Sequence, residues 1–397
     1  MPYQPRKIVS HSALVEKMIA EIAGNGPMTF ARYMEMALYD PQEGYYMTLR
    51  ENLNGEKSQR MGWQGDFYTA PELSPLLART LVQQVVEIDR YLGRPQNFVF
   101  VEMGAGTGAF ARDFLTSCRD EAPDLLSRLS YYIVERSPSL RAEQQRAIDR
   151  VVGHKESPRV QWLNSLPDCA DDSVTGVFFS NELVDAFPIH RVKGTSAGIQ
   201  EVLVDYIDGR FVECLGGLSS VKVSEYVRQH NIVVGEGCTS ELHVQAGEWM
   251  AEVASVLHRG VVITVDYGHS AGDYYRPERR DGTLLCYYRH SISRDPYDRI
   301  GEQDLTAHVN FSALANIGTT HQVLPVGFTT LANWLMGLGV DHLVAGMDQE
   351  SEEVRALAQL LHPHGMGKTF KVLVQQKNMG SVSLKGLQFR AFFDDVL

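Results

Sequence analysis

The stretch "NFVFVEMGAGTGAFARDFL", residues 97–115, decides the fold of this chain. An apolar run leads into three glycines at alternate positions, and the sequence then continues as a helix. Gly104, Gly106 and Gly108 allow positive φ angles and remove Cβ atoms where a ligand could approach the backbone, while the following helix offers free N–H groups. The spacing also fits the dinucleotide signature loosely, and the segment could instead be a tight turn that binds no ligand.

Two carboxylates beside the turn bear on the choice of ligand. Glu102 lies two residues before the first glycine, where it would repel a pyrophosphate but attract the cationic end of an amino acid. Glu135 ends the next apolar segment, "SYYIVERS", where a carboxylate can accept both hydroxyls of a ribose. Together they favour S-adenosylmethionine over a dinucleotide.

The chain on both sides of this stretch sets the expected fold. Strands and helices alternate from residue 97 to residue 181, which predicts an α/β, Rossmann-like fold with a parallel sheet and ligands at the carboxyl ends of its strands. After Pro188 the alternating pattern and a "DG" turn predict antiparallel hairpins. We expect an N-terminal helical region (1–95), a core (96–185 and 241–397) and an inserted hairpin-rich region (186–240).

The third strand carries the candidate catalytic residues. The segment "FFSNELVDAFP" places Asn181, Glu182 and Asp185 at or just past the end of the strand, at the same edge as the glycine turn. A carboxylate can bind a guanidinium bidentately, and a second one can help to position it for methyl transfer. The alternative is that Asn181 or Asp185 caps the following turn.

The composition narrows the possible partners. A formal charge of −12 argues against sequence-independent binding of nucleic acid, which needs clustered Lys and Arg. The five cysteines form no CxxC pair, which is typical of reduced thiols in a cytosol. We find no apolar stretch of about 18 residues, no secretion signal and no metal-ligand spacing, so we expect a cytoplasmic chain without membrane span or metal.

Eight segments extend the argument beyond single motifs. They resemble, in order, blocks of the MidA-like family of class I methyltransferases, and the likeness runs from about residue 10 to 377. The segments are "GDFYTAPELSP", "VEMGAGTG", "YYIVERSPSLRAEQQ", "SNELVDAFPIHRV", "ITVDYGH", "GTLLCYYRH", "DLTAHVNFSAL" and "VGFTTLANWLMGLG". The resemblance implies a seven-stranded methyltransferase core that binds S-adenosyl-L-methionine.

The resemblance also assigns residues. It places Glu102 and the three glycines at the methionine end of the cofactor, Glu135 at its ribose, and Asn164 near its adenine, although a plain turn at Asn164 is an equal alternative. The N-terminal block would fold over the cofactor as a lid; its candidate binding residues are Asp66, Thr69, Pro71 and Glu72. Without the family match, this block predicts a turn followed by a capped helix.

The same resemblance suggests a partner. The mitochondrial relative in this family is a protein-arginine methyltransferase that assists assembly of respiratory complex I. It implies methylation of arginine on a protein, with a respiratory-complex subunit as candidate, and a mitochondrial matrix location in a eukaryote. The alternatives are a non-catalytic assembly factor on a methyltransferase fold and an NAD-linked oxidoreductase.

Overall fold

The chain divides into two compact units in the computed structural model, which describes residues 12–51, 57–58, 66, 70–151, 159–348, 350–362 and 366–390. The first, here called the hairpin unit, comprises Met1–Phe67, Ala186–Gln245 and Tyr275–Ala307. The second, the sheet unit, comprises Tyr68–Asp185, Ala246–Tyr274 and His308–Leu397. Residues 275–307, which the sequence analysis assigned to the core, group with the hairpin unit.

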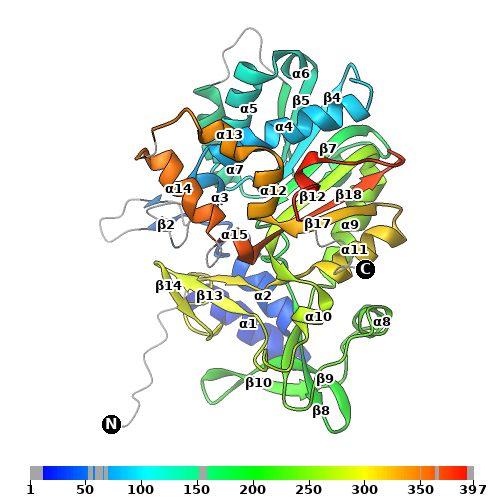
Figure 1. The fold of residues 1–397 in the computed structure, drawn as a ribbon. Coiled ribbons are helices and arrows are strands. Elements are labelled where there is room, and N and C mark those ends of the chain that lie inside the picture. Colours follow the sequence, from blue (N-terminus) through cyan, green and yellow to red (C-terminus); the bar gives the residue numbers. More distant parts are fainter. Residues whose placement is uncertain are drawn as a thin grey trace. The chain divides into compact units, whose positions relative to one another are not determined.

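A mixed sheet forms the centre of the sheet unit (Figure 1). Within the described ranges seven strands follow one another in the order β17-β18-β12-β7-β4-β5-β6, and the short β16 (Val309–Asn310) extends the end of β12. Their bounds are Leu324–Thr330, Phe370–Lys377, Leu257–His269, Val174–Asn181, Phe98–Met103, Leu129–Val134 and Arg159–Leu163. Strands β12, β7, β4, β5 and β6 are parallel, whereas β18 runs antiparallel to both of its neighbours. The expected α/β fold is confirmed.

The strand order explains where a ligand can bind. The chain moves outward from β4 to β5 and β6, then returns to the other side of β4 to form β7. In doubly wound sheets the crevice at such a reversal lies at the carboxyl ends of the strands. Here those ends carry Met103 on β4 and Asn181 on β7, so the glycine turn and the segment after β7 start from adjacent strands.

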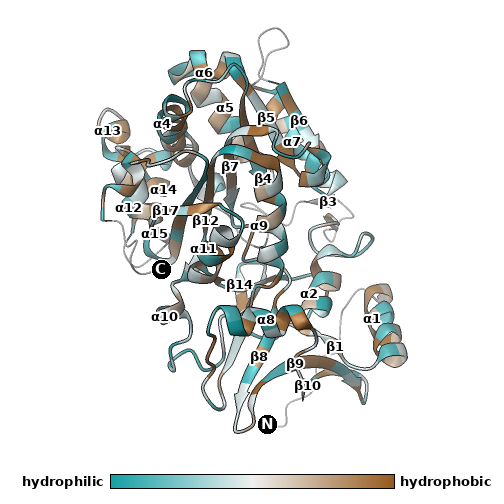
Figure 2. Cartoon of the chain, turned by 90° about the vertical axis from the view of Figure 1, so that its right-hand side faces the viewer, coloured by the Kyte–Doolittle hydropathy of each residue, from teal (hydrophilic) through white to brown (hydrophobic). Residues whose placement is uncertain are grey.

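Helices cover both faces of this sheet. On one face the rings of Phe110 and Phe114 from α5 (Ala109–Glu121) lie against Phe100 of β4, with ring centroids 6.2 and 4.6 Å apart. On the other face Trp249 of α9 (Gln245–Val256) donates from Nε1 to the sulfur of Met103 at 3.2 Å. Figure 2 shows the apolar strands between these helix layers. All six residues of β4 are buried, as expected for the central strand of a two-sided sheet.

The remaining helices of the sheet unit surround this core. They are α3 (Ala70–Leu73), α4 (Leu76–Tyr91), α6 (Pro123–Arg128), α7 (Pro138–Asp149), α10 (Ala271–Tyr274), α11 (Phe311–Thr320), α12 (Leu331–Gly337), α13 (Val340–Val344), α14 (Glu352–Leu361) and α15 (Met366–Thr369), with 3₁₀ turns at Leu166–Asp168 and Lys385–Leu387. None of the described helices has the length and apolar character needed to cross a bilayer.

Antiparallel strands dominate the hairpin unit. Strands β1 (Met28–Thr29), β9 (Gly198–Ile207), β8 (His190–Thr195) and β11 (Thr239–Leu242) follow in that order, and β10 (Arg210–Gly216) pairs with β9. Asp208 and Gly209 join β9 to β10 with φ angles of 51° and 78°, as the "DG" turn predicts. Residue 241, where we expected the core to resume, still belongs to β11, which continues to Leu242, and α9 starts at Gln245.

The other elements of the hairpin unit come from distant parts of the sequence. Helices α1 (Ser12–Asn25) and α2 (Phe30–Tyr39) precede the short pair β2 (Arg50–Glu51) and β3 (Lys57–Ser58), and α8 (Val221–Gln229) follows β10. A three-stranded sheet contains β14 (Ser291–Ser293), β13 (Leu285–Tyr288) and β15 (Asp304–Thr306). One apolar core joins α1, α2, β9 and β13 through Leu14, Tyr33, Val204 and Cys286.

Candidate functional site

The glycine turn connects β4 to α5 and has left-handed backbone geometry. The φ angles of Gly104, Gly106 and Gly108 are 70°, 53° and 83°, a region that side chains disfavour. A Cβ on Gly108 would lie 2.9 Å from the Cα of Gln144 in α7, so this glycine also allows close helix packing. The turn therefore requires glycine for two reasons: its positive φ angles, and the close approach of the backbone of α7 at Gly108.

Glu102 is buried next to the turn. Its side chain is 4% exposed, and Tyr131 of β5 donates to its Oε2 at 2.6 Å. Burial raises the pKa of Glu102 to about 8; the charge of Glu135 adds to this rise, and the Tyr131 hydrogen bond opposes it. At neutral pH most of this carboxyl is therefore protonated, and a nearby cation would favour its ionised form.

Glu135 directly follows the neighbouring strand β5, and both of its oxygens are oriented by the protein. Oε1 accepts from the backbone N–H of Ser137 at 2.8 Å, and Oε2 accepts from Nε2 of Gln144 at 3.0 Å. Burial raises the pKa of Glu135, while these donors and the charge of Arg141 oppose the rise. The backbone N–H of Arg136 is a third donor, which leaves part of the carboxylate's acceptor capacity open for a hydroxyl group.

Asn164 lies where β6 ends. Its side-chain oxygen accepts from Nη2 of Arg141 at 2.9 Å, and its backbone N–H donates to Asp168 Oδ2 at 2.7 Å. Ser165 and Asp168 form a capping box in the turn that follows. The plain-turn interpretation of this segment is thus present in the structure, and the adenine contact of Asn164 stays a prediction.

The segment after β7 begins with a strained residue. Glu182 has a φ of 53°, the left-handed region that residues other than glycine seldom adopt. Its backbone N–H donates to the carbonyl of Val265 at 2.9 Å, and its Oε1 accepts from Asn181 Nδ2 at 2.8 Å. The buried Oδ1 of Asn181 has no hydrogen-bond partner among the described residues. Strain and an unsatisfied acceptor at a strand end are typical of functional sites.

Asp266, at the carboxyl side of β12, holds this segment in place. Its Oδ2 accepts from the backbone N–H groups of Val184 at 2.9 Å and Asp185 at 3.2 Å, and its Oδ1 accepts from Tyr267 N at 2.8 Å. Asp266 is fully buried, and burial raises its pKa to about 7 although these backbone donors and the backbone N–H of Leu183 oppose this. Asp185 is 3% exposed. The sequence predicted Asp185 but not the carboxylate that positions its backbone.

The N-terminal block contributes one contact at the turn. Glu72 of α3 accepts from the hydroxyl of Thr107 at 3.1 Å, which joins α3 to the glycine turn, and Pro71 is buried in the same helix. Thr69 lies outside the described residues. The structure therefore brings Glu72 to the predicted site.

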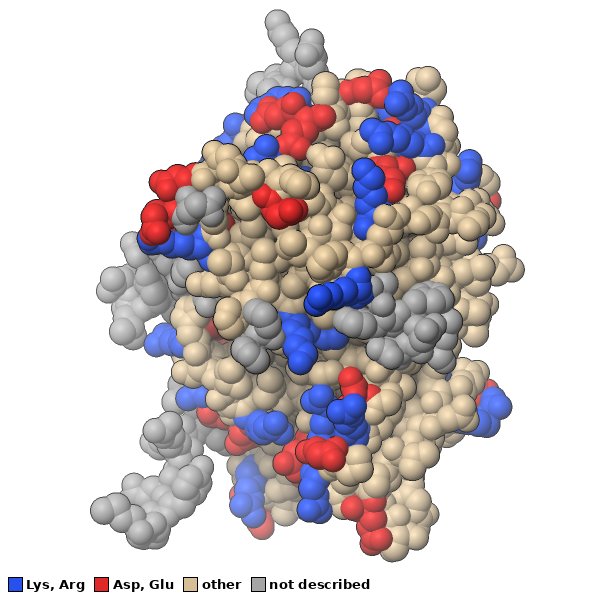
Figure 3. Space-filling model, in the orientation of Figure 1, with Lys and Arg blue, Asp and Glu red and all other residues tan. Residues whose placement is uncertain are grey.

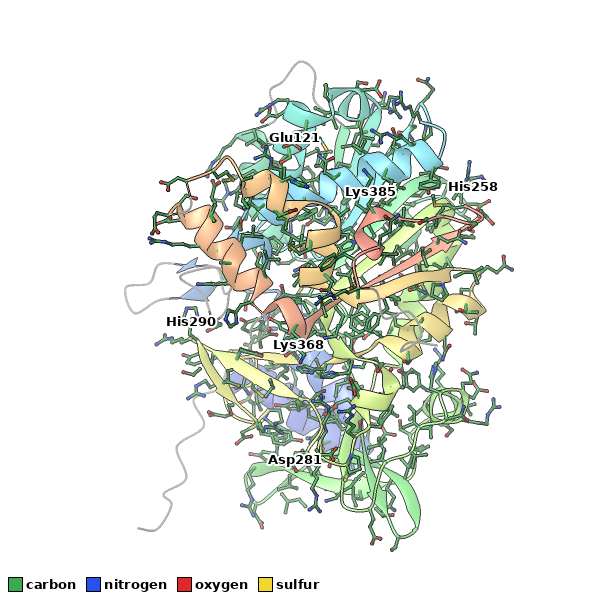
Figure 4. The ribbon with its side chains drawn as sticks, in the orientation of Figure 1. Glu121, His258, Asp281, His290, Lys368 and Lys385 are labelled. Carbon is green, nitrogen blue, oxygen red and sulfur yellow. The ribbon has the colours of Figure 1, made fainter. Side chains whose placement is uncertain are left out.

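Asp66 belongs to the hairpin unit and binds a hairpin tip there. Its Oδ1 accepts from Arg289 N at 2.6 Å, its carbonyl accepts from His290 N at 2.9 Å, and its Oδ2 accepts from the hydroxyl of Tyr45 at 3.0 Å. Arg289 and His290 form the turn between β13 and β14, where Figure 4 labels His290. The contact of Asp66 with a cofactor stays a prediction.

A histidine–aspartate pair elsewhere in the sheet unit is not part of this arrangement. His258, labelled in Figure 4, lies near the start of β12, and its Nδ1 is 2.9 Å from Asp172 Oδ2 just before β7. Both residues lie at the amino ends of their strands, whereas Asp266 and Asn181 lie at the carboxyl ends.

Acidic and basic side chains mingle on the face shown in Figure 3.

Comparison with known proteins gives this geometry a context. A family of S-adenosyl-L-methionine-dependent methyltransferases matches residues 76–329, well over half of the chain. Protein arginine methyltransferase NDUFAF7 of Xenopus tropicalis, a mitochondrial protein, is 29% identical, with 91% of this chain and 85% of the relative covered. Its Drosophila melanogaster homolog, also mitochondrial, is 27% identical, with 91% and 84% covered.

Two solved structures are similar over almost the whole chain. A Burkholderia thailandensis protein bound to S-adenosyl-homocysteine is 31% identical, with 98% of both chains covered and a TM-score of 0.85. A native crystal structure from the same organism is also 31% identical, with the same coverage and a TM-score of 0.82.

Proposed function

The chain belongs to the family of S-adenosyl-L-methionine-dependent methyltransferases, and on that premise we propose that it methylates an arginine nitrogen of a protein partner. The cofactor is S-adenosyl-L-methionine, so the dinucleotide alternative that the glycine spacing left open is set aside. The observation that carries the proposal is the group formed by Asn181, Glu182 and Asp185 at the carboxyl end of β7, beside the strand that leads into the glycine turn.

The residues around the turn fit this cofactor. We propose that the turn of Gly104, Gly106 and Gly108, with the buried carboxyl of Glu102, binds its methionine end, since an ammonium group would compensate the burial of that carboxyl. Glu135 would accept from the ribose, because its protein donors orient the carboxylate and leave acceptor capacity open. The bound cofactor supplies an electrophilic methyl group on a sulfonium.

The segment after β7 would bind the substrate. We assign the carboxylate of Glu182, oriented by Asn181, to one edge of a guanidinium, and the open Oδ1 of Asn181 to a further N–H of the same group. Asp185, whose backbone is fixed by Asp266, adds a second negative charge. Asn164 and Glu72 remain proposed contacts at the edge of the cofactor site.

The proton balance follows from the chemistry of arginine. A guanidinium is too basic to lose a proton before transfer at neutral pH, so it must enter the site charged. As the N–CH₃ bond forms and the S–CH₃ bond breaks, one N–H proton leaves the nitrogen to Glu182 or water, and the product remains a cation. The role of the carboxylates is therefore to position and stabilise a cation in a shielded site.

The identity of the partner is a finer proposal. The two relatives named above are protein arginine methyltransferases, which supports a protein substrate for this chain. A respiratory-complex subunit is the candidate that the family resemblance favours. Their mitochondrial names support the matrix for a eukaryotic chain, and the cytoplasm is the proposed location otherwise.

Label transfer tests the proposal. The purified chain is incubated with methyl-labelled S-adenosyl-L-methionine and candidate proteins, and the labelled residue is identified by mass spectrometry. Glu182→Gln should slow transfer strongly, with a cost on the order of 2–4 kcal/mol in the barrier, while S-adenosyl-homocysteine still binds. Turnover at the wild-type rate would remove Glu182 from its role. A partner complex that survives in the variant, without transfer by the wild type, would favour the assembly-factor alternative.

A further inference from the structure

Gln144 is a buried amide that contacts three elements of the sheet unit at once. It lies on α7 with no exposed surface, and its Nε2 donates to Gly106 O at 2.9 Å and to Glu135 Oε2 at 3.0 Å. Its Oε1 accepts from the indole Nε1 of Trp162 on β6 at 3.0 Å. One side chain thus connects the glycine turn, the end of β5 and β6.

The orientation of this amide has a single solution. An indole N–H can only donate, so the atom that faces Trp162 must be the amide oxygen. The NH₂ group then faces a carbonyl and a carboxylate, both of which accept. If the amide were flipped, a donor would meet the indole and an acceptor would meet two acceptors, so Trp162 fixes which end of Gln144 points to Glu135.

We infer that Gln144 is a positioning residue that couples the two ends of the cofactor site, by orienting the carboxylate at Glu135 and the glycine turn through one amide group. The inference rests on the proposed binding of the cofactor ribose by Glu135. It adds a residue that touches neither the transferred methyl group nor the substrate.

Close packing supports the same coupling. The Cα of Gln144 lies 2.9 Å from the position that a Cβ on Gly108 would occupy, so α7 rests directly on the turn. Gly106, whose carbonyl binds Gln144, has a φ of 53° and gains a fixed peptide orientation from this bond. A shift of α7 would therefore move the turn and Glu135 together.

The charges around Glu135 make the inference testable by pH. The charged groups that face it are Glu102 from β4 and Arg141 from α7, and its remaining donors are backbone N–H groups of Arg136 and Ser137. The Gln144 hydrogen bond lowers the pKa of Glu135 against the effect of burial. Without this donor, Glu135 takes up its proton at a higher pH and accepts hydroxyls less well.

Two substitutions should change the pH dependence in opposite directions. Gln144→Met removes both donors, so S-adenosyl-homocysteine should bind roughly tenfold more weakly near pH 8.5. The loss should be larger near pH 6, because without the donor the pKa of Glu135 rises further. Gln144→Glu places a second carboxylate beside Glu135. This variant should bind S-adenosyl-homocysteine most weakly near pH 8.5. Its affinity should recover towards about pH 6, where a neutral carboxyl can donate one hydrogen bond.

The experiment measures S-adenosyl-homocysteine binding by calorimetry for both variants and for the wild type at these two pH values. Gln145, the exposed neighbour on α7, provides the matched controls Gln145→Met and Gln145→Glu, which should bind as the wild type does. Trp162→Phe is a milder variant that frees the amide to flip, and it should give an intermediate loss.

The outcomes separate the inference from the proposed function. Changes of the pH slope in opposite directions from the wild type, for the Met and Glu variants, support the coupling. An equal, pH-independent loss in both variants would show that Gln144 only fills space and would overturn it. Failure of the wild type to bind S-adenosyl-homocysteine would instead remove the cofactor placement, and the inference with it.

Discussion

Tyr131 donates a 2.6 Å hydrogen bond to the carboxyl group of Glu102, and both side chains are buried inside the sheet unit. The phenol is a hydrogen-bond donor to a carboxyl whose pKa burial raises from its usual 4.5 to about 8. Between these two values the folded chain binds more protons than the unfolded chain, so the contribution of Glu102 to stability is present at low pH and is lost as pH rises.

The first prediction follows from this loss of stability as the pH rises. Glu102→Gln stays neutral at every pH and can still accept from Tyr131, so it should unfold a few degrees higher than the wild type near pH 8.5 and at a similar temperature near pH 5. Thermal unfolding at both pH values checks this, with the exposed Glu352→Gln as control. A larger advantage of the variant at the lower pH would contradict it. Stabilisation by S-adenosyl-homocysteine should be lost in Glu102→Gln.

The second prediction concerns the carboxylate that fixes the segment after β7. In Asp266→Asn the NH₂ group must face either the backbone N–H groups of Val184 and Asp185 or that of Tyr267, so a donor meets a donor in both orientations. Methyl transfer should fall roughly 10–100-fold while S-adenosyl-homocysteine binding changes little. Asp172→Asn, at the opposite end of the sheet, is the matched control and should keep full transfer. If the two variants behaved alike, Asp266 would have no special role.

The third prediction uses the backbone of Glu182. Glycine adopts a φ of 53° without strain, so Glu182→Gly should stabilise the fold by about 1 kcal/mol while abolishing transfer. Glu182→Gln should abolish transfer without the gain. Gln322→Gly, at a φ of 63° after α11, should give a similar gain with full activity. Chemical denaturation of the three variants measures these differences, and a loss of stability in Glu182→Gly would refute the strain argument.

The fourth prediction concerns the hairpin tip at Asp66. Arg289 and His290 have φ angles of 46° and 58°, a costly pair for residues with side chains. The side chain of Asp66 binds the N–H of Arg289, and its carbonyl, which alanine would keep, binds the N–H of His290. Asp66→Ala should lower the free energy of unfolding by about 1–2 kcal/mol and speed proteolysis between β13 and β14. Asp281→Ala, an exposed position labelled in Figure 4, is the control. Unchanged cleavage would show that the turn holds without Asp66.

Local sequence patterns predicted the parts of the site that lie on consecutive residues. The strand, turn and helix around Gly104, the carboxylates at strand ends and the "DG" hairpin all follow from short-range rules. The residues that the sequence missed act across elements. Gln144 looks like an ordinary polar helix residue until α7 is placed against β6, and Asp266 gains its role only because β12 lies beside β7.

Short-range sequence rules also could not predict which segments would pack together in the same unit. Leu284 and Cys286 join the same core as Leu14 and Tyr33, although some 250 residues separate them in the sequence. Alternating apolar residues predict a strand, but they do not indicate which other strand it pairs with. The hairpin-rich character of the insertion could be predicted, whereas the membership of residues 275–307 could not.

One of the boundaries between the two units falls at the bond from Asp185 to Ala186. A single peptide link therefore separates a buried acid of the proposed substrate site from the segment that builds the antiparallel strands. Deleting the insertion would cut the chain next to this acid, so a shortened protein that lost transfer could not by itself reveal where a partner docks. Point substitutions on the outer strands of the hairpin unit would locate the partner-binding surface without cutting the chain beside this acid.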